Sequence, residues 1–165
     1  MSTSTPSELQ STLSRIHDLF SKIADKACAN TSTEILAHLK DRTRGFLGDS
    51  IGELGKQGMY ACFKLMGLDE NGEAVPGLPD YTTVSFFTAP LNQIISRFTQ
   101  IMAVAHAFDA MVRDEHLPAS GIMALRDELV DVILTLAGMG MVERKKLEMF
   151  DVSITVEDGE EAIHD

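Results

Sequence analysis

The feature that most constrains this fold is the stretch of residues 89–141, which reads as two long helices almost without a polar face. In water, helices of this kind must be covered on nearly every side. The chain must therefore form a compact helical body. We expect this body to assemble further, because the apolar surface of its helices exceeds what one small bundle can bury.

The composition is that of one domain. The chain has 165 residues, 44% of them hydrophobic, which is enough for a core that folds without disulfides or metals. Cys28 and Cys62 lie in apolar helical settings, and the polar start of the chain lacks the basic residues of a secretory leader. These features favour a reduced, cytoplasmic protein. No stretch reaches the length of a bilayer span without charge, so we expect no membrane span.

The formal net charge of −11 is concentrated at the C-terminus. Residues 151–165 hold six carboxylates and no lysine or arginine, so they account for −6 and leave −5 for the rest of the chain. The sequence has no basic footprint of the kind that direct nucleic-acid binding requires. We interpret residues 1–150 as a single helical domain and the acidic tail as a flexible, solubilising appendage.

A heptad seam runs along the first predicted helix, which begins with a capping box at residues 5–8 and a proline at its first helical position. The apolar residues recur with alternating spacings of four and three, and charged residues occupy the opposite face. The seam consists of Leu9, Leu13, Ile16, Phe20, Ile23 and Ala27. We predict that it packs against a partner helix, either in the same chain or in a second copy.

A second capping box at residues 31–34 opens another predicted helix, whose continuation carries glycines on one side. These glycines, at helical spacing, are Gly45, Gly48, Gly52 and Gly55. Each interior glycine costs about 1 kcal/mol relative to alanine, so a continuous helix would need another backbone close enough to offset that cost. The segment is therefore either a continuous helix with a close-packed glycine face suited to self-association, or a series of short turns.

The remaining segments complete an all-α pattern. Residues 68–81 contain an Asn-Gly pair and two prolines and read as a loop, and residues 82–87 suit a short extended piece. Two further helices follow. The first of them carries a second heptad seam, from Leu91 to Val112, and Gly138 and Gly140 loosen the end of the second. Residues 152–156 alternate as a short strand would. The sequence thus predicts a helical bundle of about four main helices, followed by a short strand and the acidic tail.

A buried polar cluster is expected on the third helix. Asp109 falls near the middle of its apolar face, and His106 and Arg113 lie within one helical turn of it. A carboxylate in that position is expensive to bury unless it is paired. We interpret the cluster as a structural ion pair or an interhelical hydrogen bond that fixes register. The alternative is a catalytic or ligand-binding cluster, although no nucleophile, second base or phosphate loop accompanies it.

An acidic strip lies on the fourth helix, where Glu128 and Asp131 share one face. Residues 127–134, DELVDVIL, resemble the second metal-binding motif of the all-α nucleoside triphosphate pyrophosphatases, in which a Glu-x-x-Asp pairs with a Glu-x-x-Glu on the preceding helix. The resemblance implies Mg²⁺ ligation by Glu128 and Asp131. The partner motif is absent, and its nearest substitute is Asp49 with Glu53, far upstream. The simpler interpretation is the solvent-facing edge of a central helix.

These observations favour a non-enzymatic helical interaction or assembly protein that needs no cofactor. We predict that it forms homo-oligomers through its heptad seams and its glycine face, and that it could also bind another protein. A Mg²⁺-dependent nucleotide hydrolase that uses Glu128 and Asp131 is the first alternative. The second is an acidic inhibitor that occupies a basic site of a partner protein through its tail.

Overall fold

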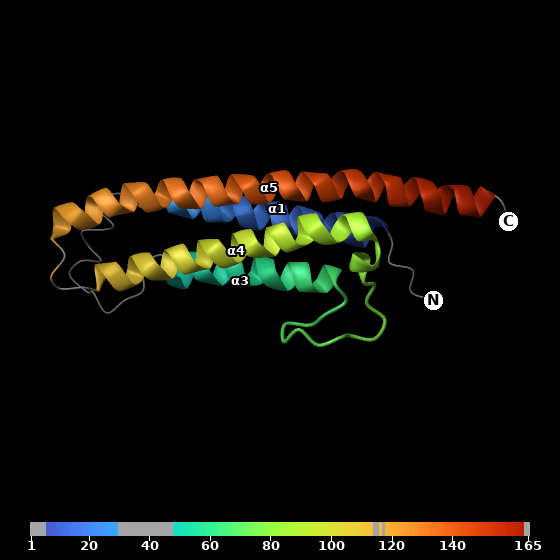
Figure 1. Ribbon diagram of the computed structural model, residues 1–165, viewed down its shortest axis with the longest axis horizontal. Coiled ribbons are helices and arrows are strands. Elements are labelled where there is room, and N and C mark those ends of the chain that lie inside the picture. Colours follow the sequence, from blue (N-terminus) through green and yellow to red (C-terminus); the bar gives the residue numbers. More distant parts are fainter. Residues whose placement is uncertain (1–5, 30–47, 114–115, 117, 164–165) are drawn as a thin grey trace.

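The helices form an antiparallel bundle in the computed structural model (Figure 1). The structure describes residues 6–29, 48–113, 116 and 118–163, with the backbone alone for residues 6–7, 119 and 150–163. α1 spans Pro6–Ala29, α3 spans Gly48–Leu65, the 3₁₀ turn η1 spans Tyr81–Thr83, α4 spans Ser85–Val112 and α5 spans Ala119–Ile163. α1 and α4 lie at opposite corners, and each packs against both α3 and α5. The all-α class is confirmed, and no sheet forms among these residues.

The heptad seam of α1 lies in the core of this chain. Each of its six residues, from Leu9 to Ala27, is at most 2% exposed. The seam belongs to the same hydrophobic core as buried residues of α3, α4 and α5, while Arg15 and Asp18 on the opposite face are exposed. The partner helices of α1 are thus α3 and α5 of its own chain.

α3 is one continuous helix in spite of its glycines. Gly48, Gly52, Gly55 and Gly58 are all buried on one side of it. A Cβ atom added at Gly52 would lie 3.2 Å from His106 Nε2, and one at Gly55 would lie 2.5 Å from Met102 Cγ. Large side chains of α4 therefore fill the space that the missing Cβ atoms leave, and this close packing offsets the conformational cost of the glycines. The capping box at residues 31–34 and Gly45 lie outside the described residues.

Two stacked phenylalanine rings cross the centre of the bundle. The rings of Phe20 on α1 and Phe98 on α4 have centroids 4.0 Å apart and planes within 3° of parallel. A Cβ at Gly58 on α3 would collide with the Phe98 ring, and a Cβ at Gly140 on α5 would collide with the Phe20 ring. These four residues, which we call the Phe20–Phe98 layer, take one member from each described helix of the bundle. The two rings fit only because a residue without a Cβ lies next to each of them.

Two segments differ from the sequence-based expectation. Residues 82–87 do not form an extended piece: only Val84 has an extended backbone, and the others are the end of η1 and the start of α4. Asp80 Oδ1 accepts the Thr82 N–H at 2.9 Å. Residues 152–156 are not a strand, because the backbone of α5 continues as a helix to Ile163. Extending an existing helix requires no new nucleation, whereas a strand would need a neighbour with which to pair.

α5 is the longest described helix, with 45 residues, and its C-terminal part projects beyond the other helices (Figure 1). The sequence predicts that Gly140 loosens the helix. In the structure Gly140 is buried, and the Phe20 ring fills the space where a Cβ would lie. Gly138, two residues earlier, is exposed, and nothing lies within 4 Å of a Cβ built there. None of the described helices contains a segment both long and apolar enough to cross a membrane.

Replacement by alanine should have opposite effects at a glycine that faces a phenylalanine ring and at one that faces open space. Gly58→Ala should lower the free energy of unfolding by about 1–3 kcal/mol, because the added methyl group overpacks against Phe98. Gly138→Ala should raise it by up to about 1 kcal/mol, because alanine favours the helix and meets no neighbour. Urea unfolding of dilute protein, followed by circular dichroism, measures both. Changes of the same sign in the two variants would contradict the packing of the Phe20–Phe98 layer.

The two thiols should differ in reactivity. Cys62 is buried in α3, and burial raises the pKa of its thiol, which keeps it in the unreactive protonated form. Cys28 on α1 is exposed. We expect a thiol reagent to label the folded protein at Cys28 and to reach Cys62 only in denaturant, as peptide mass spectrometry would show. Labelling of Cys62 at the rate of Cys28 would contradict this core.

Candidate functional site

Asp109 links α4 to the start of α3. Its side chain is 4% exposed, and its Oδ2 atom accepts the backbone N–H of Gly48 at 2.6 Å. Gly48 is the first residue of α3, so this bond satisfies a donor that has no partner inside its own helix. The helix dipole also favours a carboxylate at this end. The geometry is that of an interhelical hydrogen bond, one of the two structural roles that the sequence suggested for the buried polar cluster.

The other two members of that cluster are more accessible. His106 and Arg113 are both exposed. His106 covers the first turn of α3, since its Nδ1 atom would lie 2.8 Å from a Cβ added at Gly48. Arg113 donates its backbone N–H to the Asp109 carbonyl oxygen at 3.1 Å. The cluster therefore surrounds the start of a helix.

The acidic strip and its expected partner do not come together. Glu128 and Asp131 are exposed on α5, and Asp49 and Glu53 are exposed on α3. These two helices lie at diagonally opposite corners of the bundle. No group of three or more histidine, cysteine or acidic residues that could hold a metal ion occurs in the described part of the chain. The magnesium hypothesis gains no second pair of ligands and stays a prediction.

A groove of about 780 Å³ lies between α1, α3 and the loop of residues 66–80. Its charged lining is balanced: Arg15, Lys22, Lys64, Asp18, Asp69 and Glu70. Asp69 Oδ1 accepts the backbone N–H groups of Asn71 and Glu73, each at 2.9 Å, so this carboxylate holds the loop. The lining contains no histidine or cysteine. The mixed charges of the groove offer a ligand no single sign of charge to recognise.

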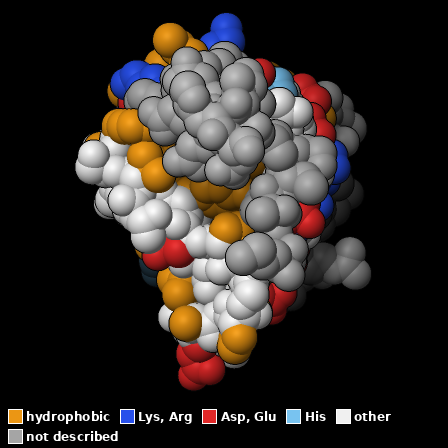
Figure 2. All heavy atoms as spheres, turned by 90° about the vertical axis from the view of Figure 1, so that its right-hand side faces the viewer, with side chains coloured by type: hydrophobic (Ala, Val, Ile, Leu, Met, Phe, Trp, Pro, Cys, Tyr) orange, Lys and Arg blue, Asp and Glu red, His pale blue; other side chains and the backbone are white. Residues whose placement is uncertain are grey.

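The end of the bundle from which α5 projects is partly apolar. Figure 2 views this end, and hydrophobic side chains are visible near the middle of it, with acidic side chains around them. A small pocket at this end is lined by residues that include Leu9, Leu65 and Tyr81. Its volume of about 20 Å³ is close to the space that one water molecule needs. The pocket is therefore too small for an organic ligand.

The surface of α5 that points away from the bundle is the most unusual feature of the described residues. We call it the outer face of α5, and it consists of Ala124, Asp127, Glu128, Asp131, Val132, Thr135, Gly138, Met139, Val142, Lys145, Lys146 and Met149, all exposed. It carries four of the six large hydrophobic residues that are most exposed in the described chain. Among these, Val142 is 57% and Met149 is 72% exposed. Exposed apolar patches occur at protein–protein, membrane-binding and ligand-binding surfaces.

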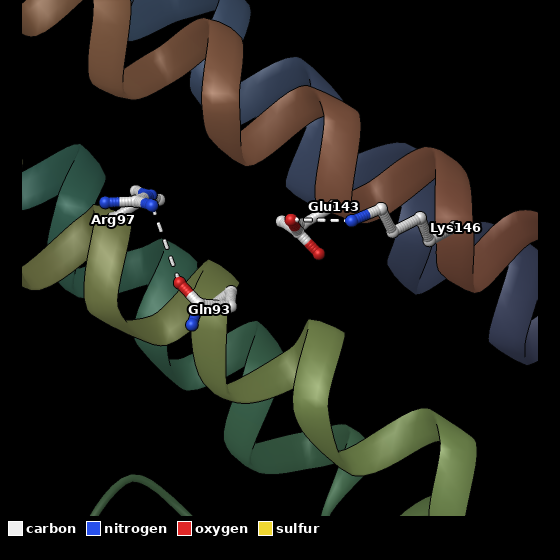
Figure 3. A network of polar contacts seen from close by, with 4 residues as sticks. All are labelled: Gln93, Arg97, Glu143 and Lys146. Carbon is white, nitrogen blue, oxygen red and sulfur yellow. Dashed lines mark hydrogen bonds and ion pairs between the residues drawn. The ribbon is translucent and has the colours of Figure 1, made fainter.

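Charge is distributed unevenly along this outer face. Its N-terminal half carries Asp127, Glu128 and Asp131, and its C-terminal half carries Lys145 and Lys146. Lys146 pairs with Glu143 at 3.0 Å along the helix, and on the neighbouring α4 Arg97 donates to Gln93 (Figure 3). Asp127 likewise pairs with its neighbour Arg126 at 2.9 Å. Within the described residues, Glu128, Asp131 and Lys145 form no ion pair.

The sequence indicates the acidic half of this face but not its apolar and basic half. Gly138 and Gly140 predict the end of a helix. That prediction separates Val132 from the apolar residues that follow, which are Met139, Val142 and Met149. The spacing of seven between Val132 and Met139, and between Val142 and Met149, is the signal that could have shown one continuous face.

Comparison of the chain with protein-family models, with curated proteins and with solved structures finds no match.

The hydrogen bond of Asp109 predicts a graded effect on stability. Asp109→Ala should lower the free energy of unfolding by about 1–3 kcal/mol, because it leaves the buried Gly48 N–H without this acceptor. Asp109→Asn should lower it less, since an amide oxygen can accept the same bond. Urea unfolding of both variants measures the difference. Equal stability of the alanine variant and the parent would remove the structural role of Asp109.

Proposed function

We propose that this chain is a non-enzymatic helical assembly protein that binds a second copy of itself through the outer face of α5. The observation that carries the proposal is the row of exposed apolar residues Val132, Met139, Val142 and Met149 on a helix whose opposite side is already packed. In water this row is unfavourable, and burying it against a like surface would remove apolar area from solvent.

The proposed contact lies on a different surface from those that the sequence suggested. The seam of α1 and the glycines of α3 are buried within the chain, so their use in self-association would require the bundle to open. The outer face of α5 needs no such opening. It combines apolar residues with charges at either end, as protein interfaces with a hydrophobic centre and a polar rim do.

Neither alternative function is favoured by a comparable observation. The hydrolase hypothesis rests on two exposed carboxylates, Glu128 and Asp131, without a second pair beside them among the described residues. The inhibitor hypothesis rests on residues 157–165, whose side chains lie outside the described part.

The chain offers a matched pair of methionines to test this proposal. Met139 on the outer face of α5 is 44% exposed, and Met111 on α4 is 42% exposed. Light scattering on a size-exclusion column at micromolar concentration should give a defined oligomer for the parent, with the same mass with and without Mg²⁺. Met139→Lys should shift it to the monomer, since it places a charge in the contact, whereas Met111→Lys should leave it unchanged.

A monomeric parent protein would overturn this proposal. An oligomer that both lysine variants preserve would place the contact elsewhere on the bundle. Circular dichroism of the two variants would show that neither substitution has unfolded the helices.

A further inference from the structure

We infer that the α5 helices of two copies pair in antiparallel orientation, with the two-fold axis passing close to Gly138. This inference rests on the proposed function and adds the partner surface and the register. It is carried by charge complementarity, by the spacing of the apolar residues and by the empty space at Gly138.

The charges on the outer face of α5 are self-complementary in only one of the two orientations. Asp131 and Lys145 each lie seven residues from Gly138, on opposite sides of it. At a rise of about 1.5 Å per residue, each lies about 10 Å from that point along the helix. In an antiparallel pair, Asp131 of one copy is opposite Lys145 of the other, and symmetry creates this contact twice. A parallel pair in register would instead place each charge opposite its equal, which is unfavourable.

The side chains in this contact are available for pairing. Asp131 and Lys145 are exposed, and neither forms an ion pair with another residue in the described ranges. Glu128, at the acidic end of the face, is also exposed and forms no ion pair with another residue in the described ranges. Asp127 and Lys146 already have partners on their own helix, so we assign them to the rim of the contact.

Apolar and small residues occupy the centre of the proposed contact. Thr135 and Val142 lie on either side of Gly138 and are seven residues apart, the spacing that keeps a stripe facing a partner helix. Val132 and Met139 repeat that spacing beside them. The side chains nearest the two-fold axis thus bury apolar surface, and the charged residues follow at both ends.

Gly138 has no role within its own bundle. A Cβ built there meets nothing within 4 Å, unlike those at Gly58 and Gly140, which collide with phenylalanine rings. A glycine in the interior of a helix is about 1 kcal/mol less favourable than alanine. Close approach of a second helix at the axis would offset this. Gly138→Ala should therefore stabilise the single chain while it raises the dissociation constant of the pair.

Cysteine crosslinking tests the orientation directly. In a Cys28→Ser background, which removes the exposed native thiol, Asp131→Cys and Lys145→Cys are made as separate proteins, one of them carrying a tag. After mixing and mild oxidation, we expect a disulfide between the two different proteins on a non-reducing gel. Either protein alone should give several-fold less crosslinked dimer.

A charge exchange provides an independent readout. Asp131→Lys should raise the dissociation constant by about tenfold or more, because it turns both opposite-charge contacts into like-charge contacts. Adding Lys145→Asp to the same chain should restore association, since the pair then has the reversed but complementary charges. Lys64→Asp, which changes a lysine on α3 that is also exposed, is the control and should leave the dissociation constant unchanged.

The outcomes separate this inference from the proposed function. A parent protein that stays monomeric overturns both. An oligomer in which Asp131→Cys crosslinks efficiently to itself has parallel helices, and that result overturns only the antiparallel pairing. An oligomer with no crosslink between the mixed proteins, or one in which the double charge exchange fails to restore association, also overturns the pairing and leaves self-association in place.

Discussion

The stacking of Phe20 on Phe98 is the interaction on which the rest of this structure depends. The two rings belong to helices at opposite corners of the bundle, and they meet because Gly58 and Gly140 leave room behind them. The layer thereby fixes the distances among all four described helices. Its main effect is to set the rotation of α5, because Gly140 must face inward to leave room for the Phe20 ring.

The rotation of α5 determines which of its residues form the outer face. With Gly140 against Phe20, Gly138 and Val142 must point away from the bundle, since each is two residues, or about 200° of helical rotation, from Gly140. The seam of α1 and the glycines of α3 are both buried within the chain by the same packing. Four of the six most exposed large hydrophobic residues then lie on this one helix, where the proposed contact is placed.

Much of the fold could be predicted from the sequence, because heptad spacing and capping signals are local. The seam of α1 and the buried position of Asp109 are examples. The roles of three other glycines could not be predicted, because Gly58, Gly138 and Gly140 look alike in the sequence and differ only in whether a side chain of another helix lies opposite them. The expected strand at residues 152–156 illustrates the same limit, since alternation over five residues says nothing about the absence of a pairing strand.

The central claim is that two copies pair through antiparallel α5 helices, and distances between spin labels test it most directly. Single cysteines in place of Lys146, Asp127 and Ser120, which are exposed at the rim of the contact or beyond it, would carry the labels in the Cys28→Ser background. An antiparallel pair centred at Gly138 predicts an axial separation of about 24 Å at position 146, about 33 Å at position 127 and about 54 Å at position 120. The same distance at all three positions, or no measurable coupling at any of them, would contradict the account.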